Sequence, residues 1–597
     1  MNAMFQYLKH LSRFFVSFLI VCYFSFSACR KKDQTPERGV VLSFIIEAGK
    51  NNALLNQDIA ATIEVNKIVL PVPRGILLNN VHITCKFKGD TLYINNVVLD
   101  TAGKQEINNN TVLTIRTRGG GRFDYKIVLN EYEDPELVIS AYSVEKSKNP
   151  ELRTDVHFEI MGDTIYGRLD PDHPGLIPTF SSISQSVHIN GAVQNEPVSA
   201  VNFNGEVVYS LASSKGFKKN YFIKISWNKK VAIPHLYITT EGNADITSKN
   251  NYLQADISID GRNVYSNYTG TTRVKGRGNS TWGLPKKPYR LKLDSKASLL
   301  GLPAEKDWVL LANYLDGTDM LNAIAMKLGK LLNMPYTNNI IPVELTLNGT
   351  YKGLYMFTEQ VEAESSRVNT GDEGVLLELD KNFDEPWQFK SASFNLPVMV
   401  KYPDVTSNEE LTTIKAQFEQ MEALIAAPDF PGNNYLDLID GGSVADYLIV
   451  YMLTDNEEIN HPKSTYIYKT STGKYTMGPI WDFDWAFGYE GSNTHFSSYS
   501  RPLFWSSSSV GTLFFSQILS DALIKEIKKK KWSDFKSGKL TELLAFADEY
   551  STLIEGARYY DYQLWKRGGA DFTNEVSNLK TWLNNRVSYL DTYIGSL

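Results

Sequence analysis

The sequence predicts a multidomain protein in which two all-β sandwich modules precede an α+β domain with a helical C-terminal half. Three observations support this prediction. The chain has 597 residues, more than one domain usually holds. Short runs of alternating apolar and polar residues, separated by Gly, Asn and Asp turns, fill residues 41–230. Helical spacing of apolar residues dominates beyond residue 404. The net charge of −6 argues against nucleic acid as a partner.

The N-terminus has the pattern of a secretory signal over residues 1–28, followed by a charged linker over residues 29–40. Lys9 and Arg13 precede an apolar run, Phe14 to Phe26. Ser27, Ala28 and Cys29 resemble a bacterial lipobox, which implies cleavage before Cys29 and a lipid on its thiol. The mature protein would then be anchored to a membrane of the cell envelope, on the periplasmic side or at the cell surface. The alternative is a transmembrane anchor, for which the apolar run is short.

Residues 41–132 and 133–230 look like two copies of one unit. In the first, Lys50–Ile63, Tyr93–Leu99 and Phe123–Leu129 follow one another; in the second, Lys148–Ile160, His188–Gln194 and Asn220–Ser226 keep that order. Such runs predict β-sandwich modules. They resemble the immunoglobulin-like repeats of Bacteroidota surface lipoproteins. The repeats either bind a glycan or surface protein or act as a spacer. We favour the spacer, because no site stands out.

Residues 233–597 form the predicted α+β domain. We expect three strands within His235–Gly261 and a helix over Asn408–Ala427. That helix places Leu411, Ile414, Phe418, Met421 and Leu424 on one face. Ser443 is the expected cap of a helix over Val444–Thr454. Three or four helices should follow near the C-terminus, with Lys528–Lys531 solvated at the end of one of them.

The stretch VKGRGNSTW, Val274 to Trp282, is a candidate anion cradle. Its two glycines permit close approach of the backbone, Lys275 and Arg277 add positive charge, and Asn279 adds a hydrogen-bond donor. The alternative is a tight hairpin without a ligand.

The following stretch, Pro288 to Asp294, is a predicted strand that supplies further cations. Leu291 and Leu293 should face the core, while Arg290 and Lys292 share the other face. A glycine-rich turn that leads into a strand with an inward lysine is how kinases hold phosphates, and Glu359 is the candidate partner of Lys292. Alternatively, Glu359 is a surface carboxylate. How the phosphates divide among the six cations of this region stays open: Lys275, Arg277, Lys286, Lys287, Arg290 and Lys292.

Two carboxylates stand in the apolar run MGPIWDFDWAFG, Met477 to Gly488. If WDFD is a strand, Asp482 and Asp484 point to one side, and Trp481, Phe483 and Trp485 to the other. A Mg²⁺ ion, which prefers oxygen ligands and is held by one or two carboxylates plus phosphate oxygens, would explain the pair. The alternative is a salt bridge or a helix cap.

Five motifs together resemble the CotH kinase family, proteins with a divergent, atypical kinase fold. They are RVKGRGNSTWGLPKKPYRLKLD, KDWVLLANYLDGT, GLYMFTEQVE, HPKSTYIYK and GPIWDFDWAFG, in this order. The resemblance implies binding of ATP and Mg²⁺ and phosphoryl transfer to hydroxyl groups of an acceptor protein, whose identity the sequence does not reveal. It implies that Asp482 is the leading metal ligand, with Asp484 close by.

One departure from the family concerns the catalytic base. Members carry an Asn-x-Asp-like segment upstream of WDFD, whereas this chain has TDNEEINHPKS, with Asn460 where the aspartate is expected. Asn460 can orient an acceptor hydroxyl or a metal but cannot take a proton. Asp455, Glu457, Glu458 and His461 are candidate substitutes.

Two other hypotheses about the function are considered. One is an inactive pseudokinase that serves as a surface adhesion protein or binds a glycan or protein. The other, a hydrolase, is disfavoured because the chain has no GxSxG or HExxH motif and its 8 His are scattered. ATP is scarce outside the cytoplasm, so another nucleotide is an open alternative as donor.

Overall fold

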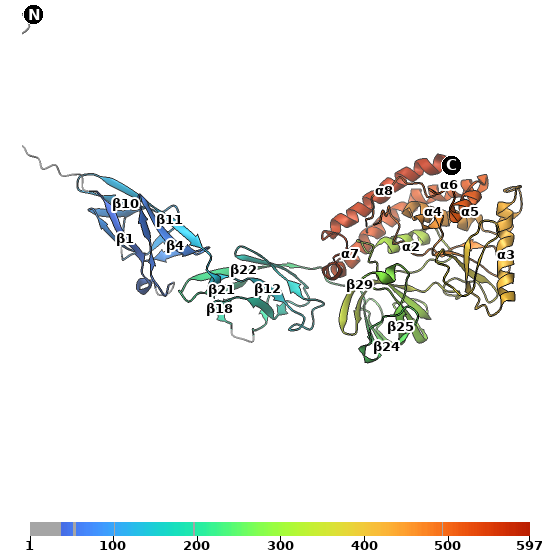
Figure 1. Ribbon diagram of the computed structural model, residues 1–597, viewed down its shortest axis with the longest axis horizontal. Helices are drawn as coiled ribbons and strands as arrows, with labels where there is room; N and C mark the ends of the chain where they lie inside the picture. The colour runs from blue at the N-terminus through green and yellow to red at the C-terminus, as the bar shows by residue number, and fades with distance from the viewer. Residues whose placement is uncertain (1–37, 52–54, 101, 195–197, 492–493, 597) are drawn as a thin grey trace, which may run out of the picture. The chain divides into compact units, whose positions relative to one another are not determined.

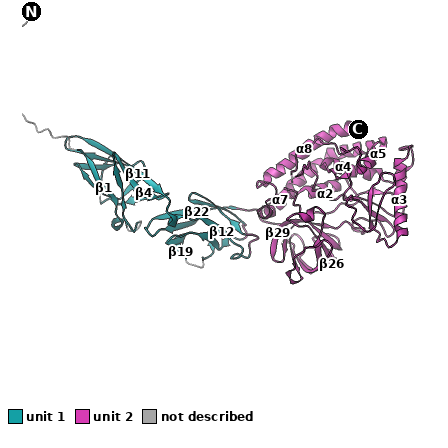
Figure 2. Cartoon of the chain, viewed as in Figure 1, with its two compact units in different colours: residues 1–150, 155–169, 173–226 teal, residues 151–154, 170–172, 227–597 magenta. Residues whose placement is uncertain are grey.

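The computed structural model describes residues 38–51, 55–100, 102–194, 198–491 and 494–596. The chain divides into two compact units, shown in different colours in Figure 2. Unit 1 comprises residues 1–150, 155–169 and 173–226, and unit 2 comprises residues 151–154, 170–172 and 227–597. The predicted signal peptide and Cys29 lie outside the described residues. Within the described part, no helix has the length and apolar character needed to cross a membrane.

Unit 1 is all-β and consists of one strand arrangement that occurs twice. The first copy has the sheets β2-β1-β6 and β3-β4-β11-β10-β7-β8 and the pair β5-β9. The second has β13-β12-β17, β14-β15-β22-β21-β18-β19 and β16-β20, so every strand has a counterpart. The segments that suggested a repeat fall on counterpart strands: Phe123–Leu129 lies in β11, and Asn220–Ser226 lies in β22. The predicted repeat is therefore confirmed.

The strands of the first copy are β1 (Val40–Ile46), β2 (Ile59–Ala60), β3 (Thr62–Glu64), β4 (Lys67–Pro73), β5 (Leu78–Val81), β6 (Thr84–Lys88), β7 (Thr91–Ile94), β8 (Val97–Val98), β9 (Gln105–Ile107), β10 (Val112–Arg116) and β11 (Arg122–Tyr132). Those of the second copy are β12 (Ala141–Val144), β13 (Val156–His157), β14 (Glu159–Met161), β15 (Thr164–Leu169), β16 (Gly175–Leu176), β17 (Pro178–Ser181), β18 (Ser186–Ile189), β19 (Ala192–Val193), β20 (Val201–Asn202), β21 (Val207–Ala212) and β22 (Lys218–Trp227).

Unit 2 begins with a closed barrel of strand order β23-β24-β25-β26-β27-β29-β28. Alternate residues fill its interior, among them Leu236, Val274, Leu291 and Trp308, all fully buried. The chain therefore places the intervening polar residues of β25 and β26 outside the barrel core. The barrel strands are β23 (His235–Thr240), β24 (Leu253–Asp260), β25 (Tyr268–Gly276), β26 (Tyr289–Ala297), β27 (Glu305–Leu311), β28 (Ile341–Leu347) and β29 (Thr350–Glu359). Residues His235–Gly261 thus form two strands rather than the expected three.

The remainder of unit 2 combines a five-stranded sheet of order β31-β32-β30-β33-β34 with helices. Figure 1 shows α7 and α8 side by side, and the two helices are in contact. The carboxylate of Asp561 in α7 accepts the amide of Leu354 in β29 at 2.8 Å, which ties the helices to the barrel. The strands are β30 (Val375–Leu379), β31 (Gln388–Lys390), β32 (Pro397–Tyr402), β33 (Thr465–Lys469) and β34 (Thr476–Met477). The helices are α2 (Leu321–Leu331), α3 (Asn408–Ala426), α4 (Gly441–Thr454), α5 (Val510–Leu519), α6 (Ala522–Asp534), α7 (Leu540–Trp565) and α8 (Phe572–Ser596).

Helix α3 confirms its predicted apolar face, but two other helical expectations were wrong. Asp440, not Ser443, caps α4 by accepting the amide of Gly442 at 2.9 Å. The hydroxyl of Ser443 instead bonds the backbone of Asp440 and Met477. Within the predicted solvated run, Lys528 is instead fully buried, because α6 packs against α4, whereas Lys530 is exposed as expected.

Candidate active site

A cleft of about 490 Å³ lies in unit 2, between the barrel and the rest of the unit. Its walls come from the turn after β25, from the sheet around β30 and β32, from the η6 turn (Glu457–Asn460) and from the WDFD segment. Charged side chains dominate the lining. The cations are Lys249, Lys275, Arg277, Lys286, Arg290, Lys401 and Lys463, and the anions are Glu378, Asp380, Asp384, Glu385, Glu458, Asp482 and Asp484.

The glycine-rich turn forms one wall because its glycines allow close packing. A Cβ on Gly276 would lie 2.3 Å from the ring of Trp282, and Gly278 has a φ of +81°, a conformation that side chains disfavour. Beyond the turn, Lys275 and Arg290 are direct partners across β25 and β26. Strand β26 and its inward Leu291 and Leu293 are as the alternation predicted.

Lys275 and Arg277 both line the cleft, and the described residues offer neither of them an ion pair. The ammonium of Lys275 lies 4.7 Å from the ring centre of Tyr252, and the guanidinium of Arg277 lies 5.3 Å from that of Trp481. Burial lowers the pKa of both groups, since a charged form away from water is disfavoured. Two cations without a carboxylate partner in one cleft are suited to an anionic ligand.

The other cations that were predicted to bind phosphate already have partners within the protein. Lys286 is buried and pairs with Asp561 at 2.6 Å, and Lys287 donates to the carbonyl of Trp282 at 2.7 Å. Arg290 lines the cleft, but its Nη2 contacts Asp307 at 2.8 Å and Glu362 at 3.0 Å. Asn279 bridges the cleft rim, accepting from Lys249 at 3.0 Å and donating to Asp384 at 3.5 Å.

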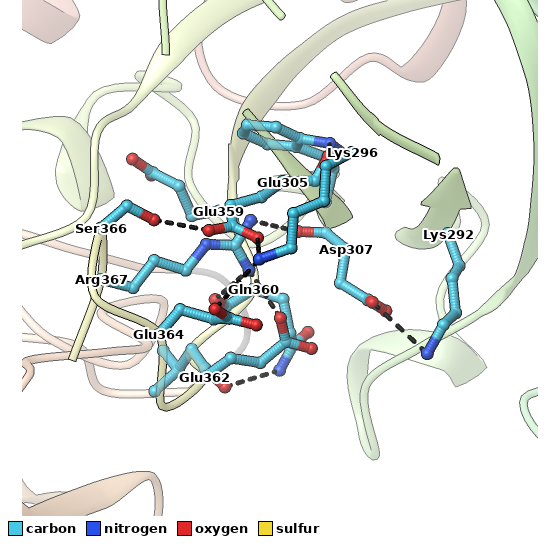
Figure 3. A network of polar contacts seen from close by, with 12 residues as sticks. Lys292, Lys296, Glu305, Asp307, Glu359, Gln360, Glu362, Glu364, Ser366 and Arg367 are labelled. Carbon is cyan, nitrogen blue, oxygen red and sulfur yellow. Dashed lines mark hydrogen bonds and ion pairs between the residues drawn. The ribbon is translucent and has the colours of Figure 1, made fainter. Parts of the chain in front are cut away.

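The prediction that Glu359 orients Lys292 is wrong. The carboxylate of Glu359 accepts hydrogen bonds from the backbone and side-chain nitrogens of Asn339, at 2.9 and 2.5 Å. Lys292, which is not part of the cleft lining, pairs instead with Asp307 at 3.5 Å, as Figure 3 shows. The reason is the strand order: β27 lies between β26 and β29, so that Lys292 faces Asp307.

The WDFD segment is not a strand, contrary to the prediction, but it does present both carboxylates to the cleft. Asp482 has a φ of +65°, which lies outside the extended region of a strand. Phe483 is in the core as expected, whereas Trp481 and Trp485 line the cleft together with the two aspartates.

Three side chains hold this irregular segment in place. Asn322 of α2 donates to Asp484 Oδ1 at 2.8 Å and accepts the amide of Phe483 at 3.0 Å. Asn456 donates to the carbonyl of Asp482 at 3.1 Å, and Nε2 of His495 bonds the carbonyl of Asp484 at 2.9 Å. We did not predict these roles, because a lone Asn or His in the sequence gives no signal of what it supports.

Asp482 and Asp484 form a crowded pair of carboxyl groups at the cleft. Burial, the charge of Asp482 and that of Asp316 raise the pKa of Asp484 to about 8. Two crowded carboxylates supported by a neutral amide are suited to a cation. Among the described residues, no group of three or more His, Cys, Asp or Glu side chains is placed to hold a metal. A pair of aspartates matches the one or two carboxylates by which proteins hold Mg²⁺ when water and phosphate oxygens complete its shell.

The candidate catalytic residues of the segment TDNEEINHPKS, upstream of WDFD, lie in different surroundings. Asn460 is fully buried, donates to the carbonyls of Glu457 and Leu503 and accepts from Thr512, so its predicted place at the acceptor hydroxyl is wrong. Glu457 lies outside the cleft lining, 3.3 Å from Arg501.

Glu458 is the carboxylate of this segment that lines the cleft. It pairs with Lys463 at 2.6 Å, and burial together with the charge of Asp482 raises its pKa to about 7. Of the other candidate bases, Asp455 is buried between Arg501 and Arg586, at 3.0 Å from each, and His461 is not part of the lining.

The comparison with protein families agrees with this site. The profile described as CotH kinase protein matches residues 274–590, more than half of the chain. The chain belongs to the CotH kinase protein family. The match begins in β25, at the start of the glycine-rich turn, and includes the WDFD segment, so most of the cleft lies in the family's shared region.

Two further comparisons add little. None of the curated proteins matches the sequence. One similar solved structure is described as a "putative glycoside hydrolase" from Bacteroides thetaiotaomicron, with 13% identity and a TM-score of 0.13, over 48% of this chain and 89% of that chain. A TM-score this low supports no conclusion about fold or function.

Proposed function

We propose that the protein is an extracytoplasmic, lipid-anchored kinase that binds ATP with Mg²⁺ and transfers phosphate to Ser or Thr hydroxyls of an acceptor protein. The observation that carries the proposal is a single cleft with two kinds of unpaired charge. Asp482 and Asp484 are crowded carboxylates, and Lys275 and Arg277 are cations without carboxylate partners. A magnesium-bound polyphosphate would neutralise both.

Each group has a role in such a reaction. Asp482 and Asp484 would hold Mg²⁺, which neutralises charge on the transferring phosphate. Lys275 and Arg277 would bind the phosphate oxygens and orient them. Glu458 would accept the proton of the acceptor hydroxyl as its oxygen bonds to the γ-phosphorus and the bond to the β-phosphate oxygen breaks. Lys463 bonds Oε1 of Glu458, which leaves Oε2 to face the hydroxyl. A pKa of about 7 suits a general base at neutral pH.

The N-terminal part of the chain would set the location. A lipid on Cys29 would place the enzyme on a membrane of the cell envelope, and the two repeats, as immunoglobulin-like sandwiches, would act as a spacer or bind a surface glycan or protein. The donor would then be a nucleotide available outside the cytoplasm.

Titration calorimetry tests the proposal. Protein of residues 30–597 is titrated with ATP, with and without Mg²⁺, beside Asp482→Ala. The matched control is Asp294→Ala, which removes an exposed carboxylate of β26 outside the cleft. We expect Mg²⁺-dependent binding that is lost in Asp482→Ala and kept in Asp294→Ala. No binding of ATP or any other nucleotide would reject the kinase and favour the alternative, an inactive surface-binding lipoprotein.

A further inference from the structure

Unit 2 contains a second cavity, of about 530 Å³, whose lining shares no residue with that of the cleft. Its walls are the loop before α2, the chain around His495 and Tyr499, Gly568, and one face of α8. The volume lies within the range of small-molecule sites, roughly 300–1,000 Å³. No step of the proposed phosphoryl transfer uses it.

The face of α8 toward this cavity carries three uncharged polar side chains. Asn578, Thr581 and Asn585 are spaced so that they share one side of the helix, and all three are exposed. Asn and Thr each cost roughly 0.5 kcal/mol or more relative to Ala inside a helix. Within the described residues, their side chains form no hydrogen bond that would offset this cost. Their donors and acceptors are therefore free to bond a ligand in the cavity.

The chemistry of the lining selects a neutral, hydroxyl-rich ligand. Among the residues that the structure describes, the lining contains no Lys or Arg, and its one carboxylate, Glu575, already accepts the amide of Gly569 at 2.9 Å. The imidazole of His495 and the indole N–H of Trp582 already bond backbone carbonyls. The other polar side chains of the lining are hydroxyls and amides, and an amide can donate to one hydroxyl and accept from another. Tyr499, which is 44% exposed, adds aromatic surface on which the C–H face of a sugar ring can pack. We propose that this cavity binds a neutral saccharide of one or two rings.

The walls of the cavity also hold the WDFD segment. His495 bonds the carbonyl of Asp484, and Trp582 donates to the carbonyl of Ser498 at 2.9 Å. On the other wall, Thr318 donates to Asp316, whose second oxygen accepts the amide of Leu321 at the start of α2. The next residue, Asn322, bonds Asp484. Saccharide binding should therefore change the affinity of the cleft for Mg²⁺ and nucleotide, a step that rests on the proposed function.

Saturation-transfer NMR tests the site directly and without nucleotide. Protein of residues 30–597 is mixed with maltose, cellobiose or N,N′-diacetylchitobiose. We expect transfer to at least one disaccharide, a loss of at least tenfold in affinity in Asn578→Ala/Asn585→Ala, and the same loss in Thr581→Trp, which fills the cavity. Asn584→Ala, exposed on α8 outside the cavity lining, is the matched control and should bind as the parent does. No transfer to any of the three, or transfer unaffected by both cavity variants, would overturn the proposal.

Calorimetry then tests the coupling. We expect the bound disaccharide to change the Kd of Mg²⁺–ATP by threefold or more, and Mg²⁺–ATP to change the Kd of the disaccharide by the same factor, because linkage is reciprocal. Disaccharide binding with no change in either Kd would overturn the proposed coupling, while the proposed saccharide site would still stand. Disaccharide binding in a protein that binds no nucleotide would reject the proposed kinase and still support the saccharide site.

Discussion

Buried polar side chains differ between the two units of this chain. In unit 1, the side chain of Asn51 donates to the carbonyls of Glu47 and His82 and accepts the amide of His82. In the second copy, Asn149 makes the same three bonds, to Glu145 and Ile177. In the cleft of unit 2, Asp482 and Asp484 are crowded together instead, and Asn322 is the only described side chain that donates to either carboxylate.

The difference separates structural from functional polar groups. A buried polar group whose bonds are all made within the protein contributes to stability, and the repeat uses the same solution twice. A crowded, partly buried carboxylate pair that forms no ion pair within the described residues destabilises the fold, so its presence is best explained by a ligand.

The largest effect is expected from Asp484→Asn, which changes the carboxylate pair of the cleft. It removes one metal ligand and the charge repulsion, so we expect the Kd for Mg²⁺–ATP to rise by at least a hundredfold while the metal-free protein gains stability above pH 8. The folded pKa of about 8 lies above the unfolded value of about 3.9. The stability that this group contributes is therefore complete below about pH 3.9 and is lost progressively as the pH rises from there to about 8.

Calorimetric binding and scanning calorimetry without Mg²⁺, at pH 6 and pH 8.5, measure the two effects. Asp294→Asn, outside the cleft, is the control. Loss of stability in Asp484→Asn at pH 8.5 would mean that the carboxylate is structural.

Asn149→Ala tests the repeat side of the comparison. It leaves the amide of Ile177 and two carbonyls unpaired in a buried place, so we expect a loss of about 2–3 kcal/mol in the free energy of unfolding of unit 1. Asn51→Ala should cost the same, because its bonds are the same. Denaturant unfolding measures both, with the exposed Asn204→Ala as control. Losses below 0.5 kcal/mol, the range of ordinary surface substitutions, would contradict the structural role.

Arg277→Met and Lys292→Met sharpen the assignment of the phosphate-binding cations. Arg277 lines the cleft without a carboxylate partner, so its loss should weaken binding of Mg²⁺–ATP about tenfold, or ~1.4 kcal/mol. Lys292 is paired with Asp307 outside the lining, so its loss should change the Kd less than twofold. The reverse order of effects would restore the Lys292 hypothesis.

The contacts of Lys292 also show which features of the structure can be predicted from sequence patterns and which cannot. The alternation of β26, the glycine-rich turn and the repeat of unit 1 were all predictable, because each is a local pattern of side-chain size and spacing. The partner of Lys292 was not, because the motif KDWVLLANYLDGT contains Asp307 but does not show that its strand, β27, pairs with β26 and lies between β26 and β29. Asn460 is similar: its place in the sequence suggested catalysis, while its bonds to Leu503 and Thr512 depend on distant segments.

The smallest effect is expected at Lys528, a buried charge outside the cleft. Its side chain is fully buried and its ammonium has no hydrogen-bond partner among the described residues. Burial and the charges of Lys525 and Lys529 lower its pKa to about 8. The unfolded value is about 10.4, so the group destabilises the fold at neutral pH, and this penalty disappears as the pH rises from 8 to about 10.4.

Lys528→Met keeps the volume and removes the charge, and should raise the free energy of unfolding of unit 2 by about 1 kcal/mol at pH 7 and by almost nothing near pH 10. Scanning calorimetry at the two pH values measures the difference. Lys529→Met, a partly exposed neighbour on the same helix, should change stability little at either pH. If Lys528→Met destabilises the protein equally at both pH values, the ammonium has a hydrogen-bonding partner. Lys528 would then be a structural polar group whose bonds are made within the protein, like Asn51 and Asn149.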